Sequence, residues 1–251
     1  MIHTLRKKNP LIHVMTNKVV ANFTANGLLA LGASPIMAKE YEEMTDIGSI
    51  ADGILLNIGT SKKADIEAYL LAGKAGNKRE IPVVLDPVGV SASKFRSAFI
   101  EQLLEEVQCT AMKGNAGEIA FLAGESWETK GVDSAGGHVE QLTEIAQTVA
   151  DKYDTIVIIS GETDIIATKN DVSLNGKGHS YLRKVTGAGC LLGAVVTAFL
   201  SLNTQDRIGA FEATRYYGLS AERAAAHPTV RGPGTFLPVF IDELGKGESD
   251  E

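Results

Sequence analysis

Short apolar runs rich in β-branched residues alternate with longer stretches of helical period along most of this chain. The runs predict strands over 11–15, 34–37, 53–58, 81–86, 109–112, 154–160, 165–168 and 172–174. The main helices are predicted over about 19–31, 63–75, 93–107, 187–202, 208–226 and 235–244, with Gly76 as a C-cap. This alternation predicts an α/β fold, a mainly parallel sheet with helices on both faces. The turns between 160 and 176 add an antiparallel edge.

The composition narrows the class of protein. The chain has 251 residues without a Pro-, Ser- or charge-rich linker, so one domain over 1–251 is expected. A formal net charge of −7 argues against nucleic acid as a main partner, because phosphate backbones attract a basic face. Two distant cysteines suit a reducing compartment, the cytoplasm, and no secretory signal is expected. The apolar stretch 187–202 is shorter than the roughly 20 residues of a membrane span, so it predicts a buried helix and no membrane partner.

The segment Val185-Thr186-Gly187-Ala188-Gly189-Cys190 precedes that buried helix. Its small residues leave backbone N–H groups uncovered at a helix start, where the helix dipole favours an anion. Cys190 falls in the first turn, and a helix N-terminus lowers the pKa of a thiol, so some thiolate character is expected. The alternative is a tightly packed helix start with an inert, buried cysteine, and the segment alone leaves both interpretations open.

A second segment, Lys113-Gly114-Asn115-Ala116-Gly117-Glu118, follows a predicted strand and opens a helix. Lys113 could neutralise phosphate charge. Asn115 and Glu118 lie three residues apart on one face, which could hold a hydrated Mg²⁺. For these residues by themselves we prefer the simpler interpretation, a helix capped by Asn115 with Glu118 completing a capping box.

Polar residues also follow two other predicted strands. Asp86 closes a buried strand before a rigid Pro-Val-Gly turn, where its carboxylate could face a metal or phosphates or form an Asx-turn. Asn17 follows the first strand, and Asn22 and Asn26 lie four apart on the next predicted helix. These amides could bind a polar ligand. We prefer a structural interpretation for Asn22 and Asn26, and helix capping is the alternative for Asn17.

Several well-known signatures are missing from the sequence. It contains no G-x-G-x-x-G after a strand, no G-x-x-x-x-G-K-[ST], no H-E-x-x-H and no G-x-S-x-G. A Rossmann dehydrogenase therefore has no support. The Gly-rich stretch 132–137 is interpreted either as a loop that orders on binding or as a helix cap.

Taken in order, the segments 16–26, 32–38, 86–89, 113–118 and 185–190 resemble the hydroxyethylthiazole kinase family of thiamine salvage. The resemblance extends over about residues 10–235, and it is specific as a series. It implies a ribokinase-like three-layer α/β/α sandwich. It also implies Mg²⁺-dependent transfer of the ATP γ-phosphoryl group to the primary hydroxyl of 4-methyl-5-(2-hydroxyethyl)thiazole. A homotrimer with active sites at subunit interfaces is a further implication.

The resemblance also implies which residues surround the phosphoryl group as it is transferred. Gly187, Ala188 and Gly189 match the anion hole for the moving phosphoryl group, although close relatives usually have Thr at position 188. Cys190 stands where most of the superfamily has an Asp base.

Ligand-binding positions follow from the same comparison of motifs. The implied ATP contacts are Lys113 and Ser160, where the family more often has Arg and Thr, and the implied metal-side acids are Asp86 and Glu118. The implied thiazole contacts are Asn17, Val19, Met37, Gly59 and Gly187.

Three other functions fit the same predicted fold. A hydroxymethylpyrimidine-type kinase and a nucleotide-dependent NAD(P)H-hydrate dehydratase usually carry Asp at the position of Cys190, which counts against both. A nucleotide-binding sensor without activity is disfavoured because Asp86, Lys113 and Glu118 are all present.

Overall fold

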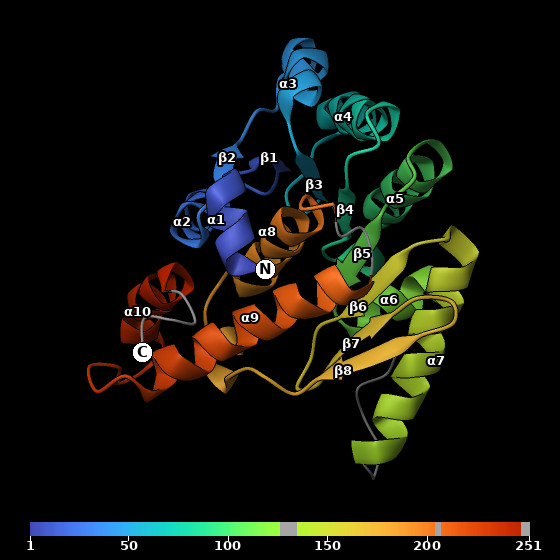
Figure 1. Cartoon of the computed structure of the whole chain (residues 1–251). Helices are drawn as coiled ribbons and strands as arrows, with labels where there is room; N and C mark the ends of the chain where they lie inside the picture. The colour runs from blue at the N-terminus through green and yellow to red at the C-terminus, as the bar shows by residue number, and fades with distance from the viewer. Residues whose placement is uncertain (126–134, 204–206, 247–251) are drawn as a thin grey trace.

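The computed structural model describes residues 1–125, 135–203 and 207–246 (Figure 1). The strands form one sheet in the order β2-β1-β3-β4-β5-β6-β7-β8. Neighbouring strands run parallel from β2 to β6 and antiparallel across β6, β7 and β8, as predicted. The strand bounds are β1 Leu11–Met15, β2 Ser34–Ile36, β3 Gly53–Asn57, β4 Val83–Asp86, β5 Ala111–Gly114, β6 Ile156–Ile159, β7 Asp164–Ala167 and β8 Val172–Asn175.

Helices cover both faces of this sheet and complete three layers (Figure 1). One face packs against α1 (Ile2–Lys8), α2 (Ala21–Leu31), α8 (Ala188–Leu200), α9 (Arg207–Ala226) and α10 (Pro233–Gly245). The other face packs against α3 (Met44–Ile50), α4 (Ile66–Lys78), α5 (Lys94–Glu106), α6 (Ala116–Ala123) and α7 (Ala135–Tyr153). Successive strand residues alternate between the two cores, as the pleat requires: Leu55 faces the first, and Ile54 and Leu56 face the second.

Single 3₁₀ turns connect several elements. They are η1 (Tyr41–Glu43), η2 (Lys63–Asp65), η3 (Val90–Ala92) and η4 (Ser180–Lys184). Local sequence explains where the longer helices start. Ser93 caps α5 by accepting a hydrogen bond from the Arg96 N–H, and Pro233 occupies the first turn of α10, where a missing N–H costs nothing.

Some element predictions were wrong in detail. Helix α4 continues past Gly76 to Lys78, and β5 begins two residues later than predicted. Helices α1, α3 and α7 were not predicted, although the buried α7 residues Leu142, Ile145, Ala146 and Val149 show a clear helical spacing. Of the Gly-rich stretch 132–137, residues 132–134 lie outside the described residues and 135–137 begin α7.

The apolar stretch near residue 190 forms α8, which lies in the middle of its layer. Eleven residues of this helix are buried, against α2, α9 and strands β1, β3 and β4. The prediction of a buried helix is confirmed. Within the described part of the chain, no helix combines the length and the apolar character that crossing a bilayer requires.

The carboxyl ends of the parallel strands bring distant polar residues to one edge of the sheet. Asn57 and Asp86 are paired in register at the ends of β3 and β4, and Lys113 lies near the end of β5. Asn17 and Ser160 follow β1 and β6. This edge is where open α/β sheets bind their ligands.

Candidate functional site

The N-terminus of α8 opens toward this edge. Gly187 is the N-cap and has a φ of 93°, in the left-handed region that favours glycine. A Cβ at this position would also lie 2.7 Å from Val20 Cγ1. The Tyr217 hydroxyl donates to the Ala188 carbonyl at 2.6 Å and holds the first turn in place. The first N–H groups of an α-helix have no acceptor within the helix, so this turn presents donors and a positive dipole end to an anion.

Lys113 and Asp86 form a buried ion pair beneath that helix end. Lys113 Nζ lies 3.6 Å from Asp86 Oδ1, and the two side chains are 5% and 0% exposed. A Cβ on Gly189 would lie 3.2 Å from Lys113 Nζ, so the ammonium group faces the first turn of α8. The structure thereby joins two segments, 113–118 and 185–190, that are far apart in the sequence.

Asn57 links this ion pair to the other side of the site. Its Nδ2 donates to Asp86 Oδ2 at 2.7 Å, and its Oδ1 accepts from Asn17 Nδ2 at 3.1 Å. Asn17 Nδ2 also lies 3.5 Å from Cys190 Sγ. One network therefore connects Cys190, Asn17, Asn57, Asp86 and Lys113.

Asn57 was missed in the sequence, although the signal was present. It closes an apolar strand as Asp86 does, and the two occupy paired positions on β3 and β4. It is fully buried, and the Tyr69 hydroxyl donates to its main-chain carbonyl at 2.8 Å. Because open α/β sheets bind ligands at this end of their strands, an amide there indicates a site as an acid does.

Asp86 and Lys113 shift each other's pKa. Burial raises the pKa of Asp86 to about 6, and Glu118 adds to the rise while Lys113 opposes it. Burial alone would lower the pKa of Lys113, but the carboxylates of Asp86 and Glu118 raise it above the usual value. At neutral pH the site therefore holds a permanent positive charge beside an acid with a weakened preference for ionisation.

The expectation of thiolate character at Cys190 was wrong. Burial and the neighbouring Asp86 raise the pKa of the Cys190 thiol, and they outweigh Lys113, Asn57 and Asn17, which lower it. At neutral pH the group is a thiol.

Glu118 has the structural role that its sequence suggested. Asn115 Oδ1 accepts from the Glu118 N–H at 2.9 Å, and Glu118 Oε2 accepts from the Asn115 N–H at 2.8 Å, which confirms the capping box. Glu118 Oε1 accepts from the Gly89 N–H at 2.9 Å and so ties α6 to the turn after β4.

For the other polar residues, the structural interpretation is wrong for Asp86 and Asn17 and holds for Asn22 and Asn26. Asp86 forms no Asx-turn, because its carboxylate is directed to Asn57 and Lys113. Asn17 does not cap α2, whose N-cap is Val20. Asn26 Nδ2 donates to Asn22 Oδ1 at 3.1 Å on an exposed face, as a structural interpretation of those two residues predicts.

The acids suit a hydrated cation better than a fully protein-bound one. Asp86 Oδ1 is buried and has no hydrogen-bond partner among the described residues; its nearest partner is the ammonium group of Lys113, at the ion-pair distance of 3.6 Å. The same residues contain no cluster of three or more His, Cys, Asp or Glu that could enclose a metal. Mg²⁺ typically binds through one or two carboxylates together with water and substrate phosphates, and Asp86 with Glu118 fits that pattern.

A cavity of about 550 Å³ adjoins the helix end. Its lining includes Ser160, Ala188, Gly189 and Tyr217 on the side of α8. Ser160 Oγ donates to the Gly114 carbonyl at 3.2 Å. Arg183 adds positive charge to the lining, which suits a phosphate group. Lys177 also lines the cavity but pairs with Glu222 at 3.6 Å, and Glu162 and Asp164 add acidic groups.

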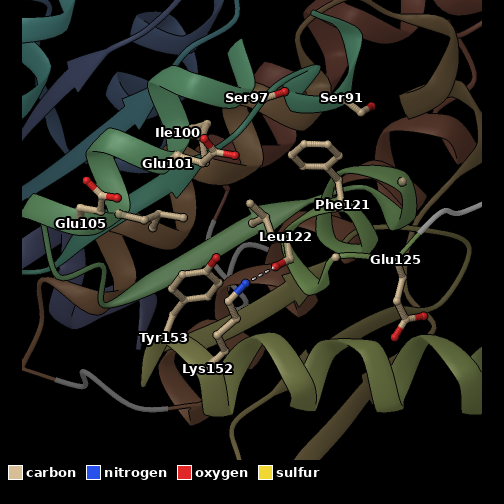
Figure 2. Close-up of a pocket in the computed structure, with 13 residues that line it drawn as sticks. Ser91, Ser97, Ile100, Glu101, Glu105, Phe121, Leu122, Glu125, Lys152 and Tyr153 are labelled. Carbon is tan, nitrogen blue, oxygen red and sulfur yellow. Dashed lines mark hydrogen bonds between the residues drawn. The ribbon is translucent and has the colours of Figure 1, made fainter. Parts of the chain in front are cut away.

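A second cavity of about 830 Å³ lies between α5, α6 and the end of α7 (Figure 2). Its floor is apolar, and Glu101, Glu105 and Glu125 surround it. None of these three carboxylates pairs with a cation among the described residues, and the Lys152 ammonium is taken up by the Leu122 carbonyl at 3.1 Å. The smaller cavity adjoins the N–H donors at the start of α8 and the larger one does not, so the smaller cavity suits an anion better.

Asp164 is a second residue that the sequence analysis missed, at the edge of the smaller cavity. Burial raises its pKa to about 6, although its oxygens accept from the Gly161 N–H and from Asn175 Nδ2. The folded protein therefore binds this proton more tightly than the unfolded chain does. Its contribution to stability is lost as the pH rises from about 4 to about 6.

We expect Asp164→Asn to raise the free energy of unfolding at pH 8 by about 1–3 kcal/mol, with little gain at pH 4. Urea unfolding at both pH values measures this difference. Asp171→Asn, at an exposed position in the turn between β7 and β8 and at the other end of β7 from Asp164, serves as the control. An equal gain at pH 4 and pH 8 would contradict the explanation by ionisation.

Two of the predicted thiazole contacts, Gly59 and Val19, lie next to a third, Asn17. A Cβ on Gly59 would come within 2.8 Å of Asn17 Nδ2, so Gly59 and Asn17 touch. The Val19 N–H donates to Asn17 Oδ1 at 3.2 Å, but the Val19 side chain is 65% exposed. Met37 follows β2 and is half-buried against the core that contains α2 and α8.

Comparison with known proteins places these features in a family. The model of the hydroxyethylthiazole kinase family matches residues 2–248. Hydroxyethylthiazole kinase 1 of Oceanobacillus iheyensis is 49% identical over 246 residues, which cover 98% of this chain and 95% of the relative. The solved hydroxyethylthiazole kinase structure of Pyrococcus horikoshii is 33% identical, with a TM-score of 0.87 over 97% of this chain and 91% of that chain.

A more distant structure supports the predicted fold class. A ribokinase-like superfamily protein from Enterococcus faecalis has a TM-score of 0.64 and 12% identity, covering 97% of this chain and 94% of that one. At this identity the likeness concerns the fold alone. The expectation of a ribokinase-like fold is confirmed.

Proposed function

The chain belongs to the hydroxyethylthiazole kinase family, and on that basis we propose that it transfers the γ-phosphoryl group of ATP to the primary hydroxyl of 4-methyl-5-(2-hydroxyethyl)thiazole, in thiamine salvage. The observation that carries the proposal is the network beneath α8. It joins a fixed cation and an acid, Lys113 and Asp86, to a polar group at the acceptor side, Asn17, through one buried amide.

Phosphoryl transfer asks mainly for positioning and for neutralisation of charge. In the proposed mechanism, the N–H groups of Ala188, Gly189 and Cys190 receive the charge that develops on the γ-phosphoryl oxygens. Lys113 adds a positive charge next to that turn, and Ser160 contacts the nucleotide in the adjoining cavity.

Asp86 and Glu118 would hold Mg²⁺, with water between carboxylate and metal. The bound ion would supply Lewis-acid neutralisation of the phosphate oxygens. The protein's own contribution here is the arrangement of the two acids. Asp86 is oriented by Asn57, and Glu118 is fixed by the N–H groups of Asn115 and Gly89.

The acceptor alcohol is proposed to lie against Asn17, Val19, Met37, Gly59 and Gly187. Asn17 can donate to a polar atom of the thiazole alcohol, and the apolar side chains of Val19 and Met37 suit its ring. Cys190 is 3.5 Å from Asn17 Nδ2, so a hydroxyl bound to Asn17 would meet the thiol. Because the thiol is protonated, we assign Cys190 to orienting the hydroxyl rather than to strong base catalysis.

The decisive experiment measures ADP release from ATP and Mg²⁺ with the thiazole alcohol, with hydroxymethylpyrimidine, with pyridoxal and without an acceptor. Turnover with the thiazole alcohol alone is the expected result. Turnover with another alcohol would support the proposed anion hole and contradict the proposed thiazole pocket. No turnover by a folded protein that still binds ATP would favour the dehydratase or the sensor.

Replacing Cys190 tests its role in the reaction. We expect Cys190→Ser to lower kcat by roughly tenfold with little change in the KM for ATP, because the thiol acts at the acceptor side. We expect Cys190→Asp to keep activity, since a carboxylate at this position can orient the hydroxyl and can also accept its proton. Steady-state kinetics with the thiazole alcohol measure both variants.

Each variant has an outcome that counts against this role. Unchanged turnover in Cys190→Ser would remove the residue from the mechanism. Complete loss in Cys190→Asp, with the fold intact by circular dichroism, would indicate a role specific to the thiol.

The proposal extends to assembly and location. One continuous sheet supports a single kinase domain over the whole chain. Large apolar side chains are exposed at Val19, whose N–H donates to Asn17, and at Leu29, Tyr41 and Ile50. The homotrimer that we propose would cover the exposed Val19 side chain at a subunit interface. The free cysteines Cys109 and Cys190 are in keeping with the cytoplasm. Light scattering of the purified protein tests the trimer.

A further inference from the structure

Two loops carry the acceptor side and the metal side of the site. The loop after β3 starts at Asn57 and includes Gly59, which touches Asn17. The loop after β4 starts at Asp86 and includes Gly89, whose N–H donates to Glu118. The relative position of the two loops therefore sets the distance between the acceptor alcohol and the acids.

Main-chain bonds between these loops end where the strands end. The β3/β4 register ends at Asn57 and Asp86, and the last main-chain bond, just past it, is donated by the Ile58 N–H to the Asp86 carbonyl at a long 3.4 Å. Beyond that point the Ile58 carbonyl accepts only within its own loop, from the Ser61 N–H at 3.2 Å. The carbonyls of Gly59 and Val88 need other donors, because carbonyls removed from water are rarely left unpaired.

Arg96, in the first turn of α5, supplies those donors. Its Nη1 donates to the Ile58 carbonyl at 3.2 Å and to the Val88 carbonyl at 2.5 Å, and its Nη2 donates to the Gly59 carbonyl at 2.5 Å. The side chain is half-buried. Every hydrogen bond that the structure gives its guanidinium goes to a main-chain carbonyl of these two loops.

We propose that Arg96 is a positioning residue for phosphoryl transfer, because its guanidinium fastens the Gly59 loop to the Val88 loop. The planar fork of arginine can serve acceptors from two separate segments at once, which the single ammonium of lysine cannot do in the same geometry. Ser97 strengthens the same region by donating to the Val90 carbonyl at 3.0 Å. The inference rests on the proposed function, because that function places the acceptor alcohol at the Gly59 loop and the metal at the Val88 loop.

The test compares Arg96→Ala with a matched variant, Arg79→Ala. Arg79 also donates to two main-chain carbonyls, those of Gly48 and Ala51 around the end of α3, but it contacts neither loop. We expect Arg96→Ala to lower kcat at least tenfold while the KM for ATP stays within twofold. Arg79→Ala should keep both within twofold. Ethylguanidinium chloride should restore part of the activity of Arg96→Ala and leave Arg79→Ala unchanged.

Wild-type kinetic constants in Arg96→Ala, or an equal loss in Arg79→Ala, would overturn the proposal. Arg96→Lys keeps the charge and most of the stem, so it decides the question if the alanine variant does not fold. We expect at least a tenfold loss of kcat in it, and full activity would overturn the proposal.

Hydrogen exchange separates this inference from the proposed function. Amides of residues 58–60 and 88–90 should exchange faster in Arg96→Ala than in Arg79→Ala, and this measurement needs no substrate. If the wild type does not phosphorylate the thiazole alcohol, the proposed function fails, but the exchange rates still test whether Arg96 fastens the two loops together. Unchanged exchange in these segments would overturn the inference about Arg96.

Discussion

Lys113→Met is expected to lower kcat by roughly 10²–10³-fold and to cost about 3–5 kcal/mol in the free energy of unfolding. The activity loss follows from removing the ammonium group that faces the first turn of α8. The stability loss follows from burial: the partner, Asp86, is fully buried and would keep a charge with no cation beside it. Assays with ATP and the thiazole alcohol, together with urea unfolding, measure both effects.

The stability loss should also depend on pH. Without Lys113 the pKa of Asp86 rises further above its present value of about 6, because Lys113 opposes the effect of burial. Asp86 can then take up a proton, so the penalty should shrink as the pH falls toward 5. A penalty of the same size at pH 5 and pH 8 would contradict this cause.

Two variants serve as controls for Lys113. Lys113→Arg keeps the charge, and we expect it to retain most of the activity. Lys74→Met removes one partner of an exposed pair, Lys74 with Glu106, and should change stability by less than about 1 kcal/mol. Wild-type kcat and stability in Lys113→Met would show that the buried pair matters neither for the fold nor for the reaction.

Gly187→Ala has the second largest expected effect, a loss of roughly 10²–10³ in kcat. Its φ of 93° is unfavourable for alanine, and the new Cβ would lie 2.7 Å from Val20 Cγ1. The N-cap must then shift, and the N–H groups of the first turn of α8 shift with it. We also expect about 1–3 kcal/mol of lost stability from strain. Kinetic assays and thermal unfolding measure the two losses separately.

Gly124→Ala isolates the contribution of strain. Gly124 has a φ of 83° at the C-cap of α6, but nothing lies within 4 Å of a Cβ there and the position is outside the proposed site. It should lose stability without losing kcat. A similar loss of kcat in both variants would show that the effect of Gly187→Ala comes from general destabilisation and not from the anion hole.

Much of the fold could be predicted because its signals are local. Continuous apolar runs such as 83–86 indicate strands that are buried on both faces, and the turns after residue 160 indicate the antiparallel edge. The capping box of Asn115 and Glu118 is equally local, and it formed as predicted. Helix α7 was missed although its apolar spacing was visible, so that error lay in the interpretation and not in the sequence.

The predicted site residues were found one segment at a time, and their chemistry depends on contacts between segments. The sequence shows an asparagine at the end of one strand and an aspartate at the end of another. Only the parallel pairing of β3 with β4 turns Asn57 into the link between Asn17 and Asp86. Arg96 carries no signal at all in the sequence, because its acceptors are main-chain carbonyls from two other loops.

The sequence by itself determined the α/β class, the antiparallel edge, the buried helix after residue 187 and the resemblance to a family, since each depends on residue types at short spacing. The tertiary structure decided the protonation of Cys190 and the pKa of Asp86. A helix start favours a thiolate wherever it is exposed, but burial beside a carboxylate reverses the balance. Desolvation and charge act through space, and the neighbours that cause them are far away along the chain.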